Sequence, residues 1–261
     1  MLKGLYTAYT GMINEQHRMD TMTNNLANVT TVGYKKEGAT SQAFQDVLTV
    51  KIKDASMGST RITQPLGFDN PGVKIGENYT DYTQGSFRIT DNTYDLALAG
   101  DGFFAIEYVN RAGERSTMYT RDGQFTLTRE GYLVTEDGDY VLDTQNNRIR
   151  LNTLLDSRIT SNGTIYQNDV AVARIQVADF ADYDYLEKYG ENLYRPLAGA
   201  TPTTANAEIK SGYLEMSNVN IVSEMVNMIA ITRQYESNQK IIQTYDDSLE
   251  IAVTQVGRLQ G

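Results

Sequence analysis

The chain contains no cysteine and a single histidine, His17. Without thiols it can form neither a disulfide nor a thiolate metal site, and one imidazole is too few for a histidine-based zinc site or a histidine relay. The missing thiols do not identify a compartment, because a protein exported unfolded also gains from having none to mispair. We therefore expect no catalytic residue, no metal site and no cofactor site in this chain.

Long apolar runs are also missing. No run approaches the ~18 consecutive apolar residues of a membrane span, so we expect no membrane-spanning segment. Residues 1–12 (MLKGLYTAYTGM) are interrupted by Lys3 and Thr10 and lack the basic region followed by an apolar block of a secretory signal peptide. The net charge of -10 argues against nucleic acid as a partner, and most of the acidic excess lies in residues 71–210, where it is typical of a solvated surface.

Both ends of the chain have helical periodicity. In residues 2–28, and again from about Ser217 to Arg258, a stripe of mainly apolar residues recurs at alternating steps of three and four, the heptad spacing of packed helices. Burying such a stripe returns less free energy than ordering the helix costs, so these helices need intersubunit contacts. The residues expected at this polymer interface are Leu2, Leu5, Tyr9, Met12, Met19, Leu26, Ile221, Met225, Met228, Ile229, Tyr235, Ile242, Leu249 and Val253.

The middle of the chain is different. Residues 30–72 are rich in Gly, Thr, Ser and Asp without sustained periodicity, and we expect an extended or partly ordered connector. Residues 73–210 contain short β-branched and aromatic runs separated by turn pairs, which predict an antiparallel sandwich or barrel-like domain. The turn pairs are Asp122-Gly123, Glu130-Gly131, Asp137-Gly138, Asn146-Asn147 and Asn162-Gly163.

The predicted fold is thus mixed α and β. Long N- and C-terminal helices form a coiled-coil-like pair, and the central domain is mainly antiparallel β. The expected division is an N-terminal axial helix at 1–29, a connector at 30–72, a central β domain at 73–210 and a C-terminal axial helix at 211–261.

Four segments carry a family resemblance. NNLANVTTVGYK (24–35), preceded by Gly11-Met12, resembles the N-terminal signature of bacterial flagellar axial proteins of the rod and hook. GYLEMSNVNIVSEMVNMIAITRQYESNQKII (212–242) is similar to their C-terminal signature. TQGSFRITDNTYDLALAGDGFF (83–104) and MYTRDGQFTLTREGYLVTEDGDYVL (118–142) resemble their β core. The short core resembles rod proteins of the distal or related proximal type more than hook proteins, although a hook-type protein is kept as an alternative.

The resemblance implies a structural subunit and no enzyme. Family members leave the cell through the flagellar type III export apparatus without a cleaved signal peptide. They polymerise, with other rod and hook proteins, into a hollow helical tube of the basal body. In that tube the terminal helices surround the export channel, the β domains form an outer layer, and the whole transmits torque across the envelope.

An envelope-associated cell-wall enzyme is the remote alternative. Ser237-Asn-Gln-Lys240 matches the S-x-x-K of penicillin-binding proteins, Lys210-Ser-Gly212 approximates K-T-G, and Thr90-Asp-Asn92 approximates S-D-N. In those enzymes S-x-x-K comes first, whereas here it comes last and inside a heptad helix. The motif is therefore attributed to helix packing.

Other candidate sites have plainer explanations. Asp137, Asp139 and Asp143 lack the spacing of a calcium loop and are expected to form turns. His17 flanks the heptad stripe and is expected at a surface or an interface, and the methionines of the stripe are expected to pack in a core. The tyrosine-rich stretch 183–194 fits an intersubunit patch and half-buried aromatics equally well.

Overall fold

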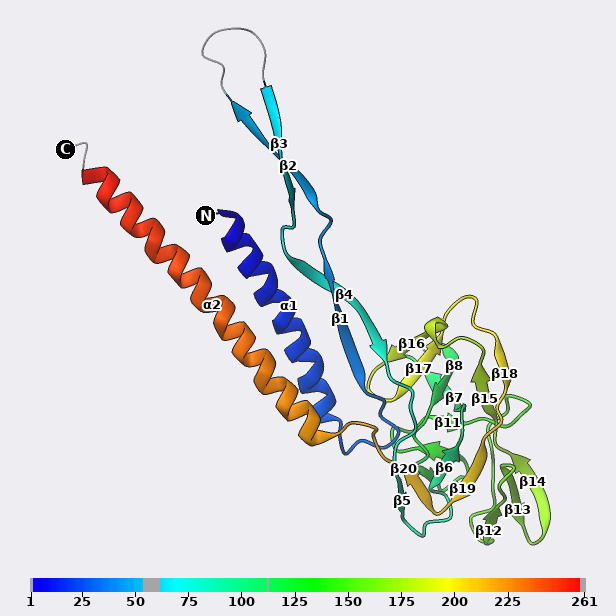
Figure 1. The fold of residues 1–261 in the computed structure, drawn as a ribbon. Coiled ribbons are helices and arrows are strands. Elements are labelled where there is room, and N and C mark those ends of the chain that lie inside the picture. Colours follow the sequence, from blue (N-terminus) through cyan, green and yellow to red (C-terminus); the bar gives the residue numbers. More distant parts are fainter. Residues whose placement is uncertain (1, 54–61, 112, 259–261) are drawn as a thin grey trace. The chain divides into compact units, whose positions relative to one another are not determined.

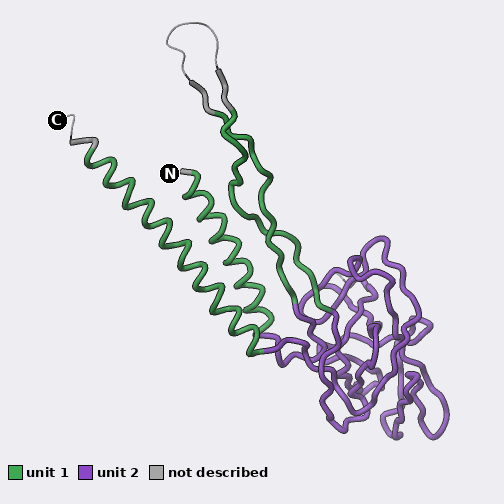
Figure 2. Tube along the Cα trace, in the orientation of Figure 1, with its two compact units in different colours: residues 1–26, 37–81, 221–261 green, residues 27–36, 82–220 purple. Residues whose placement is uncertain are grey.

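The computed structural model describes residues 2–53, 62–111 and 113–258. The chain forms two compact units (Figure 2). Unit 1 comprises residues 1–26, 37–81 and 221–261, and unit 2 comprises residues 27–36 and 82–220. Unit 1 is therefore assembled from three separate stretches of sequence. The mixed α and β class, with a helix at each end and a central antiparallel β domain, is confirmed.

Unit 1 contains the two long helices (Figure 1). Helix α1 spans Leu2–Ala27 and helix α2 spans Ile221–Arg258. At ~1.5 Å per residue the 38 residues of α2 extend over ~57 Å. Helix α1 ends just before Asn28, whose side chain accepts a hydrogen bond from Thr31 at 3.1 Å. No helix in the described residues has a stretch apolar enough to cross a membrane.

Unit 1 also contains a two-stranded ribbon. Strand β1 (Glu37–Ala43) pairs antiparallel with β4 (Val73–Thr80), and β2 (Val47–Lys53) pairs antiparallel with β3 (Ile62–Asp69). These paired strands lie where the sequence suggested a connector, while residues 54–61 of that stretch lie outside the described residues. Much of β1 and β4 is exposed. Strand β2 does alternate apolar Leu48, Val50 and Ile52 with polar residues, but this short run lies in a stretch rich in Gly, Thr, Ser and Asp and was not recognised as a strand.

The expected C-terminal segment 211–261 also differs from the structure. Helix α2 begins only at Ile221, and the residues before it continue unit 2 as strand β20 (Tyr213–Glu215), paired with β5 (Phe87–Ile89). The central β domain was expected to start at residue 73. In the structure β4 belongs to unit 1, and unit 2 resumes at Tyr82, nine residues later.

Unit 2 is built from short antiparallel strands. Its largest sheet has the order β16-β17-β8-β7-β11-β10-β9, with β15 pairing both β7 and β18. Three further sheets are β12-β13-β14, β19-β6 and β20-β5. The remaining elements are β6 Leu96–Ala99, β7 Phe103–Val109, β8 Arg115–Thr120, β9 Phe125–Leu127, β10 Leu133–Thr135, β11 Tyr140–Val141, β12 Ser157–Ile159, β13 Thr164–Gln167, β14 Val170–Arg174, β15 Val177–Phe180, the 3-10 helix η1 Tyr183–Tyr185, β16 Leu186–Tyr189, β17 Leu193–Pro196, β18 Pro202–Thr204 and β19 Glu208–Ser211.

Strand β7 lies at the centre of the hydrophobic core. Successive strand residues point to opposite faces, so Phe104 packs in one apolar cluster while Phe103 and Ala105 pack in another. All three side chains are fully buried. The first cluster contains Leu96, Phe125 and Ile149 among others, and a strand buried on both faces explains the uninterrupted apolar start of FFAIEYV (103–109).

Most of the predicted turn pairs are confirmed by their backbone angles. Gly131, Gly138 and Gly163 have positive φ, and so does Asn146. Gly123 differs, because its φ is not positive. A Cβ at Gly123 would overlap the carbonyl oxygen of Leu96, whose amide donates to the Gly123 carbonyl at 2.9 Å. Glycine is required there for a close approach of two backbone segments.

Candidate functional site

The two helices of unit 1 approach each other at glycines of α1. A Cβ added at Gly4 would overlap the Tyr245 side chain, and one added at Gly11 would lie 3.0 Å from Nδ2 of Asn238. Gly4 and Gly11 are one heptad apart, as are Asn238 and Tyr245, and the order is reversed. The helices therefore run antiparallel in a heptad register (Figure 1).

The inward side of α2 consists of two columns at heptad spacing. One column contains Met228, Tyr235, Ile242 and Leu249. The second contains Glu224, Ile231, Asn238, Tyr245 and Ala252. All of these side chains are buried or half-buried. The first column contains residues of the stripe read from the sequence, whereas Met225 and Val253 of that stripe lie one residue beyond the second column and are exposed.

The residues expected at the polymer interface fall into two groups. Half-buried within the chain are Leu5, Met12, Met19, Leu26, Met228, Tyr235, Ile242 and Leu249. Exposed are Tyr9, Ile221, Met225, Ile229 and Val253. The Leu2 side chain lies outside the described residues. The exposed group is the one that a second protein chain can reach.

Helix α1 also contacts the ribbon of unit 1. Lys3 pairs with Asp69 at 2.6 Å, and its Nζ lies 3.4 Å from Thr49 Oγ1. Asn14 Nδ2 donates to Ser41 Oγ at 2.8 Å, and the His17 ring is hydrogen-bonded to Asn78 at 3.1 Å. His17 is thus half-buried at a contact inside unit 1. Because α1 has partners on two sides, it contributes less free surface than α2.

Asn25 explains part of the asparagine-rich signature. Its Nδ2 donates to the Glu37 carbonyl at 2.7 Å, and the Glu37 amide donates to its Oδ1 at 2.9 Å. The side chain is almost fully buried. Asn25 therefore connects the last turn of α1 to the first residue of β1.

Unit 2 contains a buried ion cluster of Lys35, Arg121 and Glu215. Lys35 Nζ donates to Glu215 Oε1 at 2.7 Å and to the Thr83 carbonyl at 2.8 Å. Arg121 Nη1 donates to Glu215 Oε2 at 3.3 Å. All three side chains are at most 2% exposed. The cluster joins residues that are 180 positions apart in the sequence, from the N-terminal and C-terminal signatures.

Glu215 also accepts two backbone hydrogen bonds, one at its carbonyl and one at its carboxylate. The Gly33 amide donates to the Glu215 carbonyl at 2.8 Å, and the Gly85 amide donates to Glu215 Oε1 at 3.0 Å. Gly33 has φ of 69°, and a Cβ there would lie 2.5 Å from the Arg121 carbonyl carbon, so no larger residue fits. Nearby, Asn218 Oδ1 accepts the Lys36 amide at 2.8 Å.

Lys35 and Arg121 both pair with the Glu215 carboxylate. The Arg121 guanidinium also lies over the Phe103 ring, 5.3 Å from its centroid, where the negative face of the ring stabilises the cation. Lys35, Thr83 and Asn218 each lie within two residues of a point where the chain passes from one unit to the other.

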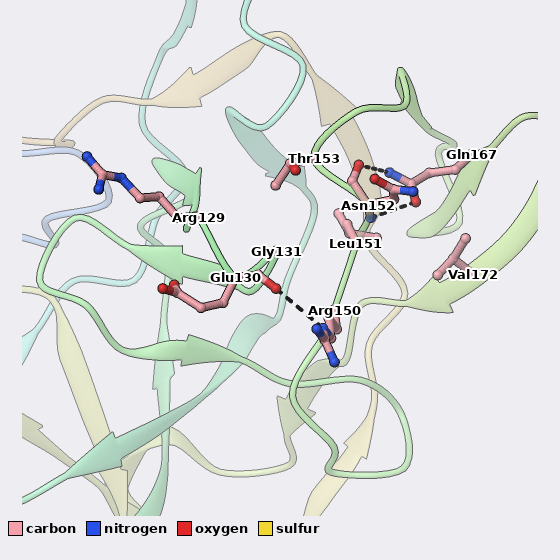
Figure 3. Close-up of a pocket in the computed structure, with 9 residues that line it drawn as sticks. All are labelled: Arg129, Glu130, Gly131, Arg150, Leu151, Asn152, Thr153, Gln167 and Val172. Atoms are coloured by element: carbon pink, nitrogen blue, oxygen red, sulfur yellow. Dashed lines mark hydrogen bonds between the residues drawn. The ribbon is translucent and has the colours of Figure 1, made fainter.

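A surface hollow on unit 2 was considered as a binding site (Figure 3). It is lined by Arg129, Glu130, Gly131, Arg150, Leu151, Asn152, Thr153, Gln167 and Val172. Gln167 pairs with the Asn152 backbone through its amide, at 2.9 and 3.0 Å, and Arg150 Nε donates to the Glu130 carbonyl at 3.3 Å. Gln167 and Arg150 thus bind backbone groups of neighbouring loops. We interpret the hollow as a place where loops meet and not as a ligand site.

The residues of the cell-wall enzyme motifs do not form a nucleophile–base pair within the described residues. Ser237 and Lys240 lie on the exposed side of α2. Ser211 Oγ donates to the Thr93 carbonyl at 2.8 Å, and the Thr90 amide donates to the Gly212 carbonyl at 2.9 Å. The segments 90–92 and 210–212 are therefore explained by hydrogen bonds between the ends of neighbouring strands.

The acidic turns and the tyrosine stretch also have structural explanations. Asp143 Oδ1 accepts the amides of Thr144 and Arg174, as expected of a turn residue. Across the residues that the structure describes, no group of three or more His, Asp or Glu side chains could hold a metal ion. Tyr194 is buried against Phe103 and Tyr183 is partly buried, whereas Tyr185 and Tyr189 are exposed.

Three family models match the sequence. They are the flagellar basal body rod protein family at residues 5–35, the flagellar hook protein FlgE/F/G D1 domain at residues 97–167 and the flagellar basal body rod FlgEFG protein C-terminal family at residues 210–255. The first and third contain the residues of the ion cluster that come from the two terminal signatures.

Full-length relatives agree with the family models. The chain is 37% identical to the flagellar basal-body rod protein FlgG of Bacillus subtilis, with 96% of this chain and 97% of the relative covered. It is 34% identical to FlgG of Borreliella burgdorferi, over 97% of this chain and 98% of the relative, and 33% identical to the rod protein FlgF of Caulobacter vibrioides, over 99% and 100%. These relatives are rod proteins and do not favour the hook alternative. With matches of this identity over nearly its whole length, the chain belongs to the family of flagellar basal-body rod proteins.

Proposed function

We propose that this chain, a structural subunit of the flagellar rod, polymerises into a hollow helical tube that transmits torque and encloses an export channel. Its partners are further copies of itself and the other rod and hook proteins of the basal body. The chain is exported by the flagellar type III apparatus without cleavage, works outside the cytoplasm and carries no catalytic centre.

The observation that carries this proposal is an exposed apolar face at the start of α2. Ile221, Val222, Met225, Val226 and Ile229 are between 46% and 72% exposed. They are spaced so that they share one side of the helix. The opposite side of α2 is already buried inside unit 1. A surface helix that is apolar on both its inner and outer sides calls for a further protein partner.

The ribbon of unit 1 adds a second exposed apolar surface. Leu48 and Phe68 are cross-strand partners, and they are 52% and 76% exposed. Val50 and Leu66 are exposed beside them. Edge strands with exposed apolar side chains are prone to association with other chains. In a polymer subunit this property is useful, because each copy must bind several neighbours.

We further propose that α1 and α2 pair as an antiparallel coiled coil. The heptad register of Gly4 with Tyr245 and of Gly11 with Asn238 supports this pairing. A rigid helix pair would present the outer face of α2 in the same orientation on every copy, as a helical assembly requires.

The test is assembly of purified full-length protein, followed by sedimentation and electron microscopy. We expect the wild type to form tubes or rods as its concentration rises, and Met225→Asp to remain monomeric with an unchanged circular dichroism spectrum, because Met225 is 51% exposed. Ser237→Asp, an exposed change on the same helix, is the matched control and should assemble normally. A wild type that stays monomeric at every concentration, alone and with rod partners, would contradict the proposal.

A further inference from the structure

Met225 differs from the other methionines of the chain in its exposure. It lies in the second turn of α2, and its side chain is 51% exposed. Among the methionines in the part of the chain that the structure describes, it alone is exposed: Met118 is buried, and the others, including Met228, are half-buried. Since a peroxide must reach the sulfur to oxidise a thioether, Met225 should react before them.

The Met225 side chain lies within the exposed apolar face at the start of α2. Val222, Val226 and Ile229 are 72%, 60% and 55% exposed on the same side of the helix. A thioether is apolar and fits such a surface, whereas its sulfoxide carries a polar oxygen that needs a hydrogen-bond donor. Packing that oxygen against apolar side chains of another chain leaves it without a donor and costs free energy. Oxidation of one sulfur atom therefore changes the chemical character of this surface.

We infer that Met225 is a peroxide-sensitive modification site, and that its oxidation to methionine sulfoxide blocks assembly reversibly. In the reaction with hydrogen peroxide the sulfur attacks the O–O bond and takes one oxygen atom, and the other oxygen leaves as water. Methionine sulfoxide reductases reverse the change: a dithiol is oxidised to a disulfide, and the sulfoxide oxygen leaves as water. The inference rests on the proposed function and adds to it a chemical signal that decides whether a subunit can assemble.

The same helix contains an internal control. Met228 lies three residues after Met225 but belongs to the inward column of α2, and its side chain is half-buried within unit 1. Its oxidation should be slower and should weaken the packing of unit 1 itself. In an assembled polymer Met225 is expected to be covered by a neighbouring chain, so peroxide should act on the free subunit and spare the assembled one.

The test treats the full-length monomer with hydrogen peroxide for increasing times. Mass mapping of peptides gives the extent of oxidation at each methionine, circular dichroism monitors the fold, and sedimentation measures the protein concentration needed for assembly. We expect Met225 to be oxidised first, with an unchanged circular dichroism spectrum, and the concentration needed for assembly to rise at least about tenfold. Treatment with both methionine sulfoxide reductases, one for each sulfoxide epimer, should restore assembly.

Three variants assign the effect to one sulfur atom. Met225→Leu should assemble as the wild type does and should still assemble after peroxide treatment, because leucine has a similar volume and no sulfur. Met225→Gln carries a polar amide at the same position and should assemble poorly without any peroxide. Met228→Leu retains the exposed thioether and should remain as sensitive to peroxide as the wild type.

Three results would overturn the inference: normal assembly of protein whose Met225 is fully oxidised, equal loss of assembly in peroxide-treated Met225→Leu and wild type, or oxidation of Met228 before Met225. In each of these cases the untreated wild type still assembles, so the proposed function stands. If the untreated wild type does not assemble, alone or with rod partners, the proposed function fails and the inference fails with it.

Discussion

The side-chain amide of Asn25 makes two hydrogen bonds to the backbone of a single residue, Glu37. Both groups of that buried amide are thereby satisfied, and the end of α1 is fixed to the start of the ribbon across the segment that enters unit 2. The arrangement predicts a specific cost for losing the amide.

Asn25→Ala should destabilise unit 1 by about 2 kcal/mol, because it leaves the Glu37 amide and carbonyl without their partner. Hydrogen exchange of the Glu37 amide, together with urea unfolding, would measure the loss. Gln16→Ala, an exposed change on the same helix, is the control and should stay within about 0.5 kcal/mol of the wild type. Equal exchange rates in Asn25→Ala and the wild type would contradict this role.

The ion cluster predicts an asymmetry among its members. Glu215→Gln removes the buried carboxylate that Lys35 and Arg121 share and should cost about 3–5 kcal/mol. Lys35→Met leaves Glu215 paired with Arg121 and should cost less. Denaturant unfolding followed by tyrosine fluorescence would compare the two.

An exposed pair gives the control for this comparison. Glu187 and Arg195 are bonded on the surface, so Glu187→Gln should change stability by less than about 1 kcal/mol. If Lys35→Met proved as damaging as Glu215→Gln, the loss of the shared carboxylate would not be the governing factor.

Two glycines of unit 2 should respond differently to alanine. A Cβ at Gly123 would overlap the Leu96 carbonyl, whereas Gly138 has positive φ but open space around it. Gly138→Ala should therefore cost about 1 kcal/mol, for its backbone conformation alone. Gly123→Ala must also displace backbone and should cost more than about 3 kcal/mol. Thermal unfolding of both variants tests this order, and a reversed order would refute it.

Asp122 predicts a pH dependence. Burial raises the pKa of this carboxyl to about 6, although hydrogen bonds from the Gln124 amide and Asn192 lower it. A folded-state pKa above the unfolded value means that its contribution to stability is complete below about pH 4 and is lost as the pH rises through about 6. The wild type should lose on the order of 2 kcal/mol more than Asp122→Asn between pH 4 and pH 7.5.

Asp156→Asn, at an exposed position, serves as the control and should follow the wild-type pH profile. Urea unfolding at a series of pH values gives the comparison. Parallel profiles for the wild type and Asp122→Asn would show that the carboxyl does not titrate in this range.

The sequence was most informative where a pattern repeats. Heptad spacing located both helices and the column Met228, Tyr235, Ile242 and Leu249. It did not identify the second inward column, because that column includes the polar Glu224 and Asn238, while the more apolar Met225 and Val253 one residue further on are exposed. Apolarity alone cannot distinguish a surface that packs inside the chain from one left for another chain.

The ion cluster could not be predicted in the same way. Lys35 and Glu215 have ordinary local contexts, and charged residues are mostly exposed, so nothing nearby marks them as buried. Their relationship depends on a pairing across 180 residues, which a single sequence does not reveal. The ribbon escaped detection for a different reason, since the alternating run of β2 is short and lies in a stretch rich in Gly, Thr, Ser and Asp.

The division of unit 1 into three stretches of sequence has a consequence during protein synthesis. Unit 2 is complete once residue 220 has left the ribosome, because all of its residues precede α2. Unit 1 must wait for the last residues of the chain, since α1 has no helical partner until α2 is translated. The helix pair of unit 1 therefore forms later than unit 2 can, because it needs residues that follow all of unit 2 in the sequence.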